Sequence, residues 1–170
     1  YGENKEFTKS GSNIWTYGIR CYTSKDLYNW EDKGLIIPPD TENPLSSLHP
    51  SQQYDRPHTI FFFFSKKYVA WIKVMGSSQS MTILTADDFM GPYTKIKEGY
   101  RPNGFESGDF DLYMDEKTGK GYIWAERPHC EMICSTLNDD FTSVTSEFSN
   151  HFIGILPPDT REAPTHFVRK

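Results

Sequence analysis

Three acidic residues recur at a nearly constant spacing along this chain of 170 residues. Asp55, Asp109 and Glu162 are separated by about 54 and then about 53 residues. Carboxyl groups that converge on one cavity raise one another's pKa, which keeps a general acid protonated near neutral pH. A pair of carboxyl groups across a sugar ring can hydrolyse a glycosidic bond. The alternative is that each residue is a solvated surface charge, but unrelated surface acids have no reason to recur in phase.

The residues around these acids repeat together with them. A tyrosine, Tyr68 or Tyr122, follows thirteen residues after each aspartate and opens an apolar stretch. The repeated units also share a strand pattern that ends in a short acidic corner, in residues 21–30, 83–89 and 133–141. A period of about 50 residues with roughly four strands per unit is typical of a β-propeller.

Strand signals account for most of the remaining sequence, and long helical periodicity is missing. Apolar strands are expected over residues 14–17, 68–72, 81–85 and 121–124, and polar strands over 31–37, 93–97 and 144–148. The run Phe61–Phe64 is apolar at every position, whereas an amphipathic strand would alternate. We therefore expect this run to be buried on both faces of a sheet.

These patterns predict one all-β domain over residues 1–170, a β-propeller covering about three blades of four-stranded antiparallel sheet. The expected divisions are an incomplete blade over 1–54, blades over 55–108 and 109–161, and the first strand of a further blade over 162–170. Each acid stands just before the innermost strand of its blade, a place that faces the central channel. Three blades leave open sheet edges, which pair readily with another chain. A homo-oligomer that completes the propeller is therefore an expected assembly.

Composition excludes several classes of function. The net charge of −5 and a pI near 5.5 argue against nucleic-acid binding, which needs a basic surface. No apolar run approaches the roughly 18 residues of a membrane span, so a membrane is not an expected partner. Three cysteines cannot form a disulfide framework. The chain starts at Tyr1 without a signal-peptide pattern, so we expect a piece of a longer protein. Its compartment stays open, and a secreted or periplasmic location is compatible with the sequence.

Several segments together resemble glycoside hydrolase family 43, and in particular its branch of exo-β-1,3-galactanases. Tyr1-Gly2-Glu3 and residues 21–30 (CYTSKDLYNW) resemble two segments of that branch. The other matching segments are Asp55-Arg56-Pro57, Arg101-Pro102-Asn103-Gly104, Ser107-Gly108-Asp109 and Arg161-Glu162-Ala163-Pro164. The family folds as a five-bladed propeller and hydrolyses glycosides with inversion. The resemblance thus implies an inverting glycoside hydrolase that acts on an oligo- or polysaccharide, with this chain as an incomplete copy.

The resemblance also implies roles for individual residues. Glu162 corresponds to the general acid, which protonates the leaving glycosidic oxygen. Asp109 corresponds to the acid that raises the pKa of this group and orients it. Glu3 corresponds to a residue that binds a sugar hydroxyl, and Asp55 stands where the galactanase branch usually has Glu. The general base of the family corresponds to positions outside residues 1–170.

One motif departs from the family, and no cofactor is implied. Gly108 stands where the family usually has arginine, so one cationic partner is missing. A calcium ion or a water cluster can occupy the centre of the channel in the family. His58 and His166 follow the acidic motif by three and four residues and are expected near that channel. Cys130 and Cys134 are on the order of 13 Å apart on a strand, too far to share one metal ion.

Further candidate residues lie beside the motifs. Arg56, Arg101 and Arg161 could bind sugar hydroxyls, or they could form structural ion pairs. Tyr100 and Phe105 flank a Pro-Asn-Gly loop and are the aromatic rings that we expect to stack on a sugar. Most other strand aromatics are expected in the core. The predicted substrate-binding residues are Glu3, Asp55, Arg56, Tyr100, Asn103, Phe105 and Arg161.

Three functions are compatible with these observations. The first is a family 43 glycosidase, most consistent with an exo-β-1,3-galactosidase, with α-L-arabinofuranosidase and β-xylosidase as alternatives of the same class. The second is a non-catalytic, carbohydrate-binding or vestigial propeller, which Asp55, Gly108 and the missing base favour. The third is a protein-interaction propeller, which predicts no converging acids.

Overall fold

The computed structural model describes residues 17–76, 78–167 and 169, and in these residues it contains strands, turns and one short 3-10 turn. The strands are β1 (Ile19–Ser24), β2 (Trp30–Ile37), β3 (Tyr54–Phe62), β4 (Lys67–Val74), β5 (Ser80–Ala86), β6 (Thr94–Tyr100), β7 (Phe110–Met114), β8 (Gly121–Arg127), β9 (Glu131–Leu137) and β10 (Val144–His151). The turn η2 (Pro102–Gly104) connects β6 and β7. No helix in the described part of the chain is long and apolar enough to cross a membrane.

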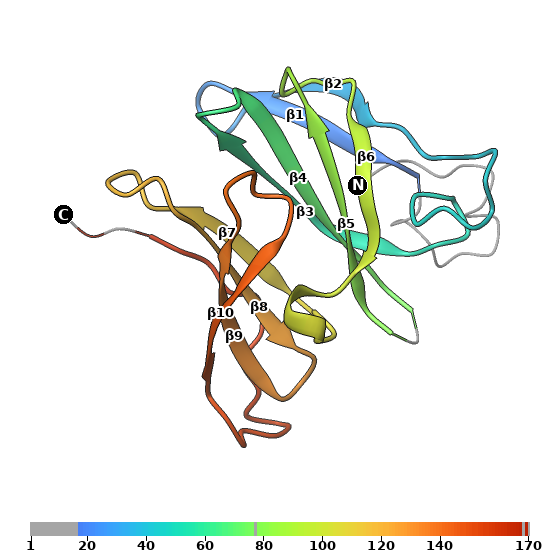
Figure 1. Cartoon of the computed structure of the whole chain (residues 1–170). Helices are drawn as coiled ribbons and strands as arrows, with labels where there is room; N and C mark the ends of the chain where they lie inside the picture. The colour runs from blue at the N-terminus through green and yellow to red at the C-terminus, as the bar shows by residue number, and fades with distance from the viewer. Residues whose placement is uncertain (1–16, 77, 168, 170) are drawn as a thin grey trace.

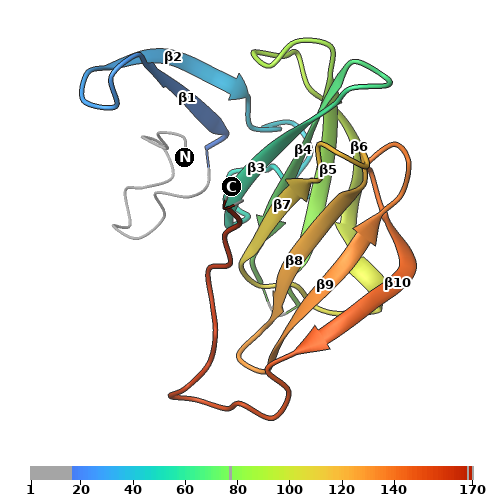
Figure 2. The same cartoon turned by 90° about the vertical axis from the view of Figure 1, so that its left-hand side faces the viewer.

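The strands form three antiparallel sheets that follow one another along the chain (Figures 1 and 2). β1 and β2 pair with each other, β3 to β6 form a four-stranded meander, and β7 to β10 form a second one. The first strands of the two meanders, β3 and β7, contact each other and lie side by side in Figure 2. Two meanders with adjacent first strands have the arrangement of neighbouring propeller blades, as the sequence repeat predicts.

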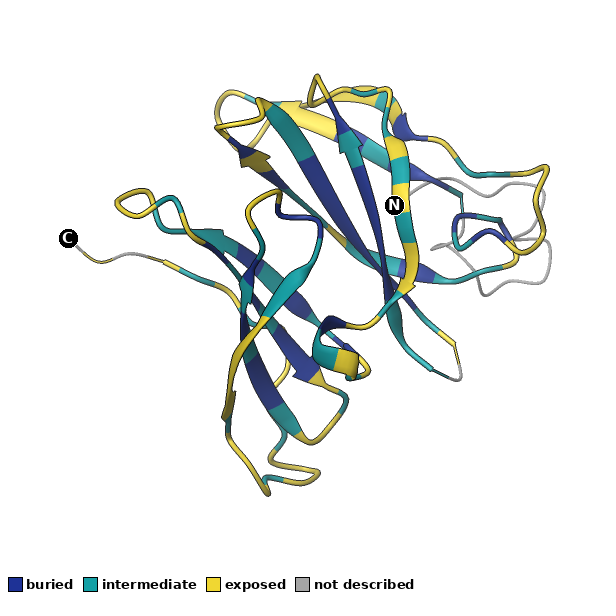
Figure 3. Cartoon of the chain, viewed as in Figure 1, coloured by how far each residue is buried: buried dark blue, intermediate teal, exposed yellow. Residues whose placement is uncertain are grey.

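Burial follows the position of each strand within its blade (Figure 3). β4 and β5 are central strands and carry buried residues on both faces, and most of their buried side chains are apolar. β6 and β10 are outer strands, and most of their residues are exposed or half-buried. Inner and central strands thus supply the core, and outer strands supply the solvent surface.

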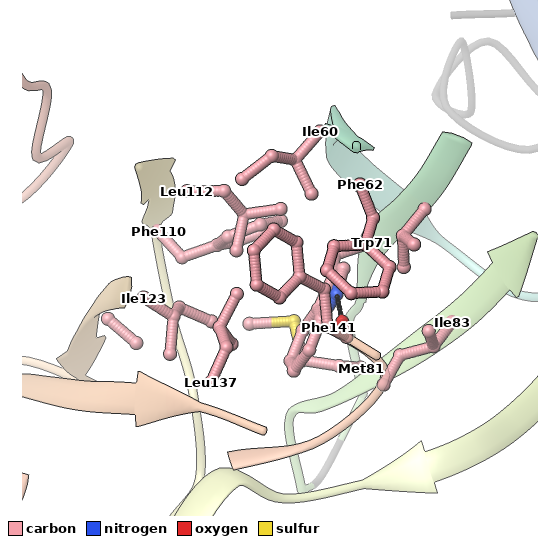
Figure 4. Packing of buried hydrophobic residues seen from close by; sticks show 12 residues of the cluster. Ile60, Phe62, Trp71, Met81, Ile83, Phe110, Leu112, Ile123, Leu137 and Phe141 are labelled. Carbon is pink, nitrogen blue, oxygen red and sulfur yellow. Dashed lines mark hydrogen bonds between the residues drawn. The ribbon is translucent and has the colours of Figure 1, made fainter. Parts of the chain in front are cut away.

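One hydrophobic cluster joins the two four-stranded blades (Figure 4). Trp71 of β4 and Phe141, in the turn between β9 and β10, are fully buried there. The indole Nε1 of Trp71 donates a hydrogen bond of 2.9 Å to the backbone carbonyl of Phe141. Gly121 leaves room for the Phe141 ring, because a Cβ at position 121 would lie 2.8 Å from it. Burial of one such aromatic side chain stabilises the fold by about 2–3 kcal/mol.

A second cluster joins the two-stranded sheet to the first full blade. Ile19 and Ile37 of β1 and β2 pack with Tyr54, Ile72 and Leu84. The core therefore consists of layers between successive sheets, which is how a propeller buries both faces of each blade.

Two expectations from the sequence are wrong. Phe61–Phe64 is not a fully buried strand: β3 ends at Phe62, and Phe63 and Phe64 lie in the following turn with 69% and 79% of their surface exposed. The strand expected over Ala163–Arg169 is not formed in residues 163–167, because a strand needs a hydrogen-bonded neighbour and this segment enters none of the described sheets.

The strand expected near the start of the chain and the boundaries between the repeats stay predictions. The strand expected over residues 14–17 lies outside the described residues apart from Tyr17, which belongs to no strand. The repeat boundaries at positions 54, 108 and 161 stay a prediction, although the two full meanders fall between them.

The indole hydrogen bond generates a prediction about stability. Trp71→Phe removes the donor and leaves the buried carbonyl of Phe141 without this partner, which should lower the free energy of unfolding by about 2 kcal/mol. Trp30→Phe is the matched control, because Trp30 is exposed and its replacement should cost less than about 0.5 kcal/mol. Urea unfolding followed by far-UV circular dichroism measures both values. Equal losses in the two variants would contradict the assigned role of Trp71.

Candidate active site

The ammonium group of Lys73 bridges two of the three recurring acids. Its Nζ lies 3.1 Å from Asp55 Oδ1 and 2.9 Å from Asp109 Oδ1. Lys73 faces Asp55 directly across the β3–β4 ladder, and Asp109 immediately precedes β7 of the next blade. The bridge therefore ties the inner ends of two blades together, and it places two carboxyl groups around one buried cation.

Burial and charge act in opposite directions on the pKa values of this group. Burial by itself would lower the pKa of Lys73, but the hydrogen bond to Asp109 and the charge of Asp55 outweigh it and the pKa is raised. Burial raises the pKa of Asp55, and the neighbouring ammonium only partly offsets this. Lys73 thus stays charged, while Asp55 is easier to protonate than an ordinary aspartate.

Arg56 completes this first cluster. Its Nη2 lies 3.3 Å from Asp109 Oδ2, so Asp109 contacts one cation with each oxygen. The backbone of Arg56 is left-handed, with φ at +50°, at an irregularity in the β3–β4 ladder between Asp55 and His58. This bulge turns the arginine toward the next blade. The structure thus shows an ion pair for Arg56, and its contact with a sugar stays a prediction.

A second cluster surrounds Glu162. His129 Nδ1 lies 2.9 Å from Glu162 Oε1 and 3.5 Å from Glu126 Oε1. Glu126 is buried, and its carboxylate accepts hydrogen bonds from the backbone N–H groups of Asp109 and His129. Because Glu126 touches both Asp109 and His129, it connects the first cluster to Glu162. The ligand atoms of Glu126, His129 and Glu162 lie within 4.8 Å of one another, which is also compatible with one shared cation.

A third group of titratable residues lies on and around β7. Asp111 of β7 lies between two histidines, with His58 Nδ1 at 3.0 Å from Oδ1 and His166 Nδ1 at 2.5 Å from Oδ2. Burial lowers the pKa of His58. An open pocket of about 370 Å³ is lined by Arg56, His58, Asp111 and residues 163–165. Residues 163–167 thus lie alongside β7 where the innermost strand of a further blade was expected. His58 lines the pocket and His166 contacts Asp111, and their place near a central channel stays a prediction.

A larger hollow of about 710 Å³ lies elsewhere, near the far ends of the strands. It is lined by Phe62, Phe64 and Phe141 among others, whereas Asp55 is at the opposite end of β3. The smaller and more polar opening is lined by neighbours of the recurring acids, namely Arg56 and Phe110 next to Asp55 and Asp109, and Ala163 next to Glu162.

Three of the predicted substrate-binding residues hold the blades together in this structure. Tyr100 Oη accepts a hydrogen bond from the Val144 backbone N–H, at 2.9 Å, and its ring packs against the inter-blade cluster. The side-chain amide of Asn103 bonds to β9 and β10. Phe105 packs edge-on against Phe148 of β10. These contacts give the three residues a structural role, and sugar contact by them stays a prediction.

The other predicted positions differ in their surroundings. Arg161 is exposed and donates to the backbone carbonyl of Asp159. Arg101 is also exposed, and Glu3 lies outside the described residues. The sequence reasoning missed Lys73, Glu126 and the contact of His129 with Glu162. A lysine inside the otherwise apolar stretch 68–74 is the signal that could have identified Lys73.

The fold and this site can be compared with known proteins. No model of a known protein family matches the sequence, and no curated protein matches it. A β-1,3-galactosidase of glycoside hydrolase family 43 is 30% identical, with a TM-score of 0.72 over 81% of this chain and 30% of that protein. The exo-β-1,3-galactanase from Phanerochaete chrysosporium, solved with β-1,3-galactotriose, is 25% identical, with a TM-score of 0.68 over 80% of this chain and 33% of its own.

The fold recurs in more distant structures. The exo-β-1,3-galactanase from Clostridium thermocellum is 21% identical, with a TM-score of 0.70 over 81% of this chain and 32% of that protein. The chain spans about a third of the length of these three proteins. The resemblance to glycoside hydrolase family 43 is thereby confirmed, as is the all-β fold class of a partly covered five-bladed propeller.

The lysine bridge predicts a pH-dependent loss of stability. Lys73→Met leaves Asp55 and Asp109 without this cation and should cost about 3–5 kcal/mol at pH 7. In the wild type the Lys73 ammonium group lowers the pKa of Asp55 against the effect of burial, so its removal raises that pKa further. The folded variant then takes up a proton at a higher pH than the folded wild type, which favours folding of the variant as the pH falls. The deficit should therefore shrink between pH 7 and pH 4, as measured by urea unfolding at each pH.

The control for this experiment is an exposed ion pair. Lys67→Met removes the partner of Asp87 at the surface and should cost less than about 1 kcal/mol at either pH. A deficit for Lys73→Met that is as small as this, or that does not change with pH, would show that the bridge does not hold the blades.

Proposed function

We propose that this chain supplies the acid side of the active site of an inverting exo-β-1,3-galactosidase. The observation that carries the proposal is the placement of Glu162 next to the His129–Glu126–Asp109 series, with the residue that follows it, Ala163, lining the polar pocket. Glu162 acts as the general acid, and Asp109, held by Lys73 and Arg56, orients the site from β7. The similarity to a β-1,3-galactosidase and to a galactanase solved with β-1,3-galactotriose supports galactose in β-1,3 linkage as the substrate.

The chemistry assigned to the chain is a single proton transfer. Glu162 gives its proton to the glycosidic oxygen while the bond between that oxygen and the anomeric carbon breaks. A water molecule adds to the anomeric carbon from the opposite face and loses its proton to a general base, which inverts the configuration. We expect this base to come from outside residues 1–170. The arabinofuranosidase and β-xylosidase alternatives use the same step on a different sugar.

A specific observation favours a second candidate, a carbohydrate-binding propeller without catalysis. Asp55 and Asp109 both contact Lys73, so two of the three recurring acids are engaged in ion pairs. Such a site can bind sugar hydroxyls through its charged groups even where no base completes the reaction. The galactose-bound and galactotriose-bound states of similar structures support saccharide binding in either case.

We expect a further sheet to pack on the open face of the β7–β10 sheet. The outer face of the β7–β10 sheet carries the half-buried rings of Tyr113, Tyr122 and Trp124. His166 covers part of it, with ring centroids 5.2 Å from Tyr113 and 5.7 Å from Trp124. In a propeller this face packs against the next blade. We propose that further propeller sequence or a second copy of the chain covers it.

Replacement of the general acid is the direct test of function. Glu162→Gln removes the proton donor and should lower galactose release from β-1,3-galactan by about 10²–10⁴-fold, measured by chromatography of the released sugar. Glu116→Gln is the control, because Glu116 lies exposed in the turn between β7 and β8. Aryl α-arabinofuranoside and aryl β-xyloside are assayed in parallel to separate the alternatives.

The possible outcomes separate the two candidate functions. Galactose release that only Glu162→Gln abolishes supports the galactosidase. Absence of turnover by an assembly that includes the sheets expected to supply the base, together with galactan binding measured by calorimetry, would favour the non-catalytic propeller.

The open aromatic face predicts the state of the chain in solution. The isolated chain should associate, so its mass by light scattering should exceed the 19.7 kDa of one copy and rise with concentration. Trp124→Lys should shift the mass toward one copy. A concentration-independent mass of one copy with a cooperative thermal transition would contradict the assembly.

A further inference from the structure

We propose that His129 is a positioning residue for Glu162, held in place by Glu126, whose carboxylate occupies the space left by the missing side chain at Gly108. The proposal rests on the proposed function in one respect, namely that Glu162 is the general acid. The arrangement has three steps, which run from the backbone at Gly108 to the carboxyl group of Glu162.

The first step is the space above Gly108. A Cβ at this position would lie 2.6 Å from Glu126 Oε2 and 3.0 Å from its carboxyl carbon. Gly108 is buried, and its backbone does not require glycine, since no positive φ is found there. The reason for glycine is therefore the room that it leaves. Any side chain at position 108 has to displace the carboxylate of Glu126.

The second step is the fixation of Glu126. Only 4% of the residue is exposed, so its carboxylate needs partners inside the protein. Oε2 accepts from the backbone N–H of Asp109 at 3.2 Å, and Oε1 accepts from the backbone N–H of His129 at 2.8 Å. The backbones of residues 126 and 109 are themselves joined, with Glu126 N–H donating to Asp109 at 2.8 Å. Glu126 is thus a rigid support that also fixes the turn at His129.

The third step is the imidazole of His129. Its backbone has a φ of +55°, a left-handed conformation that is uncommon outside glycine, although asparagine, aspartate and histidine adopt it more often than other residues. The N–H contact with Glu126 holds this conformation and places Nδ1 between two carboxyl groups, at 3.5 Å from Glu126 and 2.9 Å from Glu162. A proton on Nδ1 can be donated to Glu162 Oε1. The other oxygen of Glu162 is then left to carry the proton that the glycosidic oxygen receives.

This contact matters because the backbone does not fix Glu162. Residues 155–167 enter none of the described sheets, so no ladder sets the register of this segment. Side-chain contacts at His129 and, four residues after Glu162, between His166 and Asp111 hold it instead. Without His129, the carboxyl group of Glu162 loses its link to Glu126 and Asp109.

The first test reads the proton on His129 without any need for activity. Histidine-labelled protein is examined at pH 7 by ¹⁵N–¹H correlation spectroscopy, and the His129 ring is assigned with His129→Asn. We expect a proton on Nδ1, a signal that Glu162→Gln and Gly108→Ala both shift and that Glu116→Gln leaves unchanged. A ring that carries its proton only on Nε2, or that does not respond to Glu162→Gln, would overturn the proposal.

The second test separates positioning from structure through a matched pair of variants. His129→Asn keeps an N–H donor near the position of Nδ1 and tolerates the left-handed backbone. His129→Asp has the same shape and the same tolerance, but it lacks the donor. We expect galactose release to stay within about threefold for Asn and to fall about tenfold or more in kcat for Asp, with KM little changed. Equal activity of the two variants would overturn the role of the donor.

The two tests also separate this proposal from the proposed function. If the wild-type chain releases no galactose, the spectroscopic test still decides whether His129 holds Glu162. If galactose is released and the spectroscopic test fails, the general acid is positioned by other contacts.

Discussion

The ammonium group of Lys73 is the interaction on which the candidate site depends. It lies between Asp55 of one blade and Asp109 of the next, and its 2.9–3.1 Å contacts allow two carboxyl groups to approach in a largely buried place. Without a cation there, the two acids would repel each other and would separate the inner ends of β3 and β7. The charge at this end complements the apolar cluster around Trp71 and Phe141, which joins the same two blades along their length.

The repeat of Asp55 and Asp109, each followed by a strand that a tyrosine opens, predicted units of about four strands, and the structure has four-stranded meanders in β3–β6 and β7–β10. It worked because blades are local meanders, so a sequence period maps directly onto strands and turns. The prediction that Phe61–Phe64 forms a buried strand was wrong because the chain turns after Phe62. Apolar composition alone does not indicate where a hairpin turn begins. The prediction of a strand after Glu162 was wrong for residues 163–167, because none of the described strands pairs with this segment.

The site was harder to predict than the fold. Motifs were enough to propose Glu162 and Asp109 as candidates, and their roles stay predictions, whereas Lys73 and Glu126 lie inside strands whose pattern indicates only a core. Their role depends on contacts between residues far apart in sequence, such as Lys73 with Asp109. The contacts of Tyr100, Asn103 and Phe105 could not be predicted for the same reason. Their position beside a loop suggested exposed rings and amides that contact a sugar, whereas these side chains pack and hydrogen-bond against the next blade.

The bond between Trp71 and Phe141 also bears on the order in which the protein becomes structured. Trp71 belongs to the first full blade, but the carbonyl that satisfies its indole lies 70 residues later, beyond β9. During synthesis the first blade therefore leaves the ribosome with a polar group and a wide apolar face uncovered. That face stays open to solvent and to chaperones until nearly the whole second blade has been made. Folding of the two blades is thus coupled in time as well as in space.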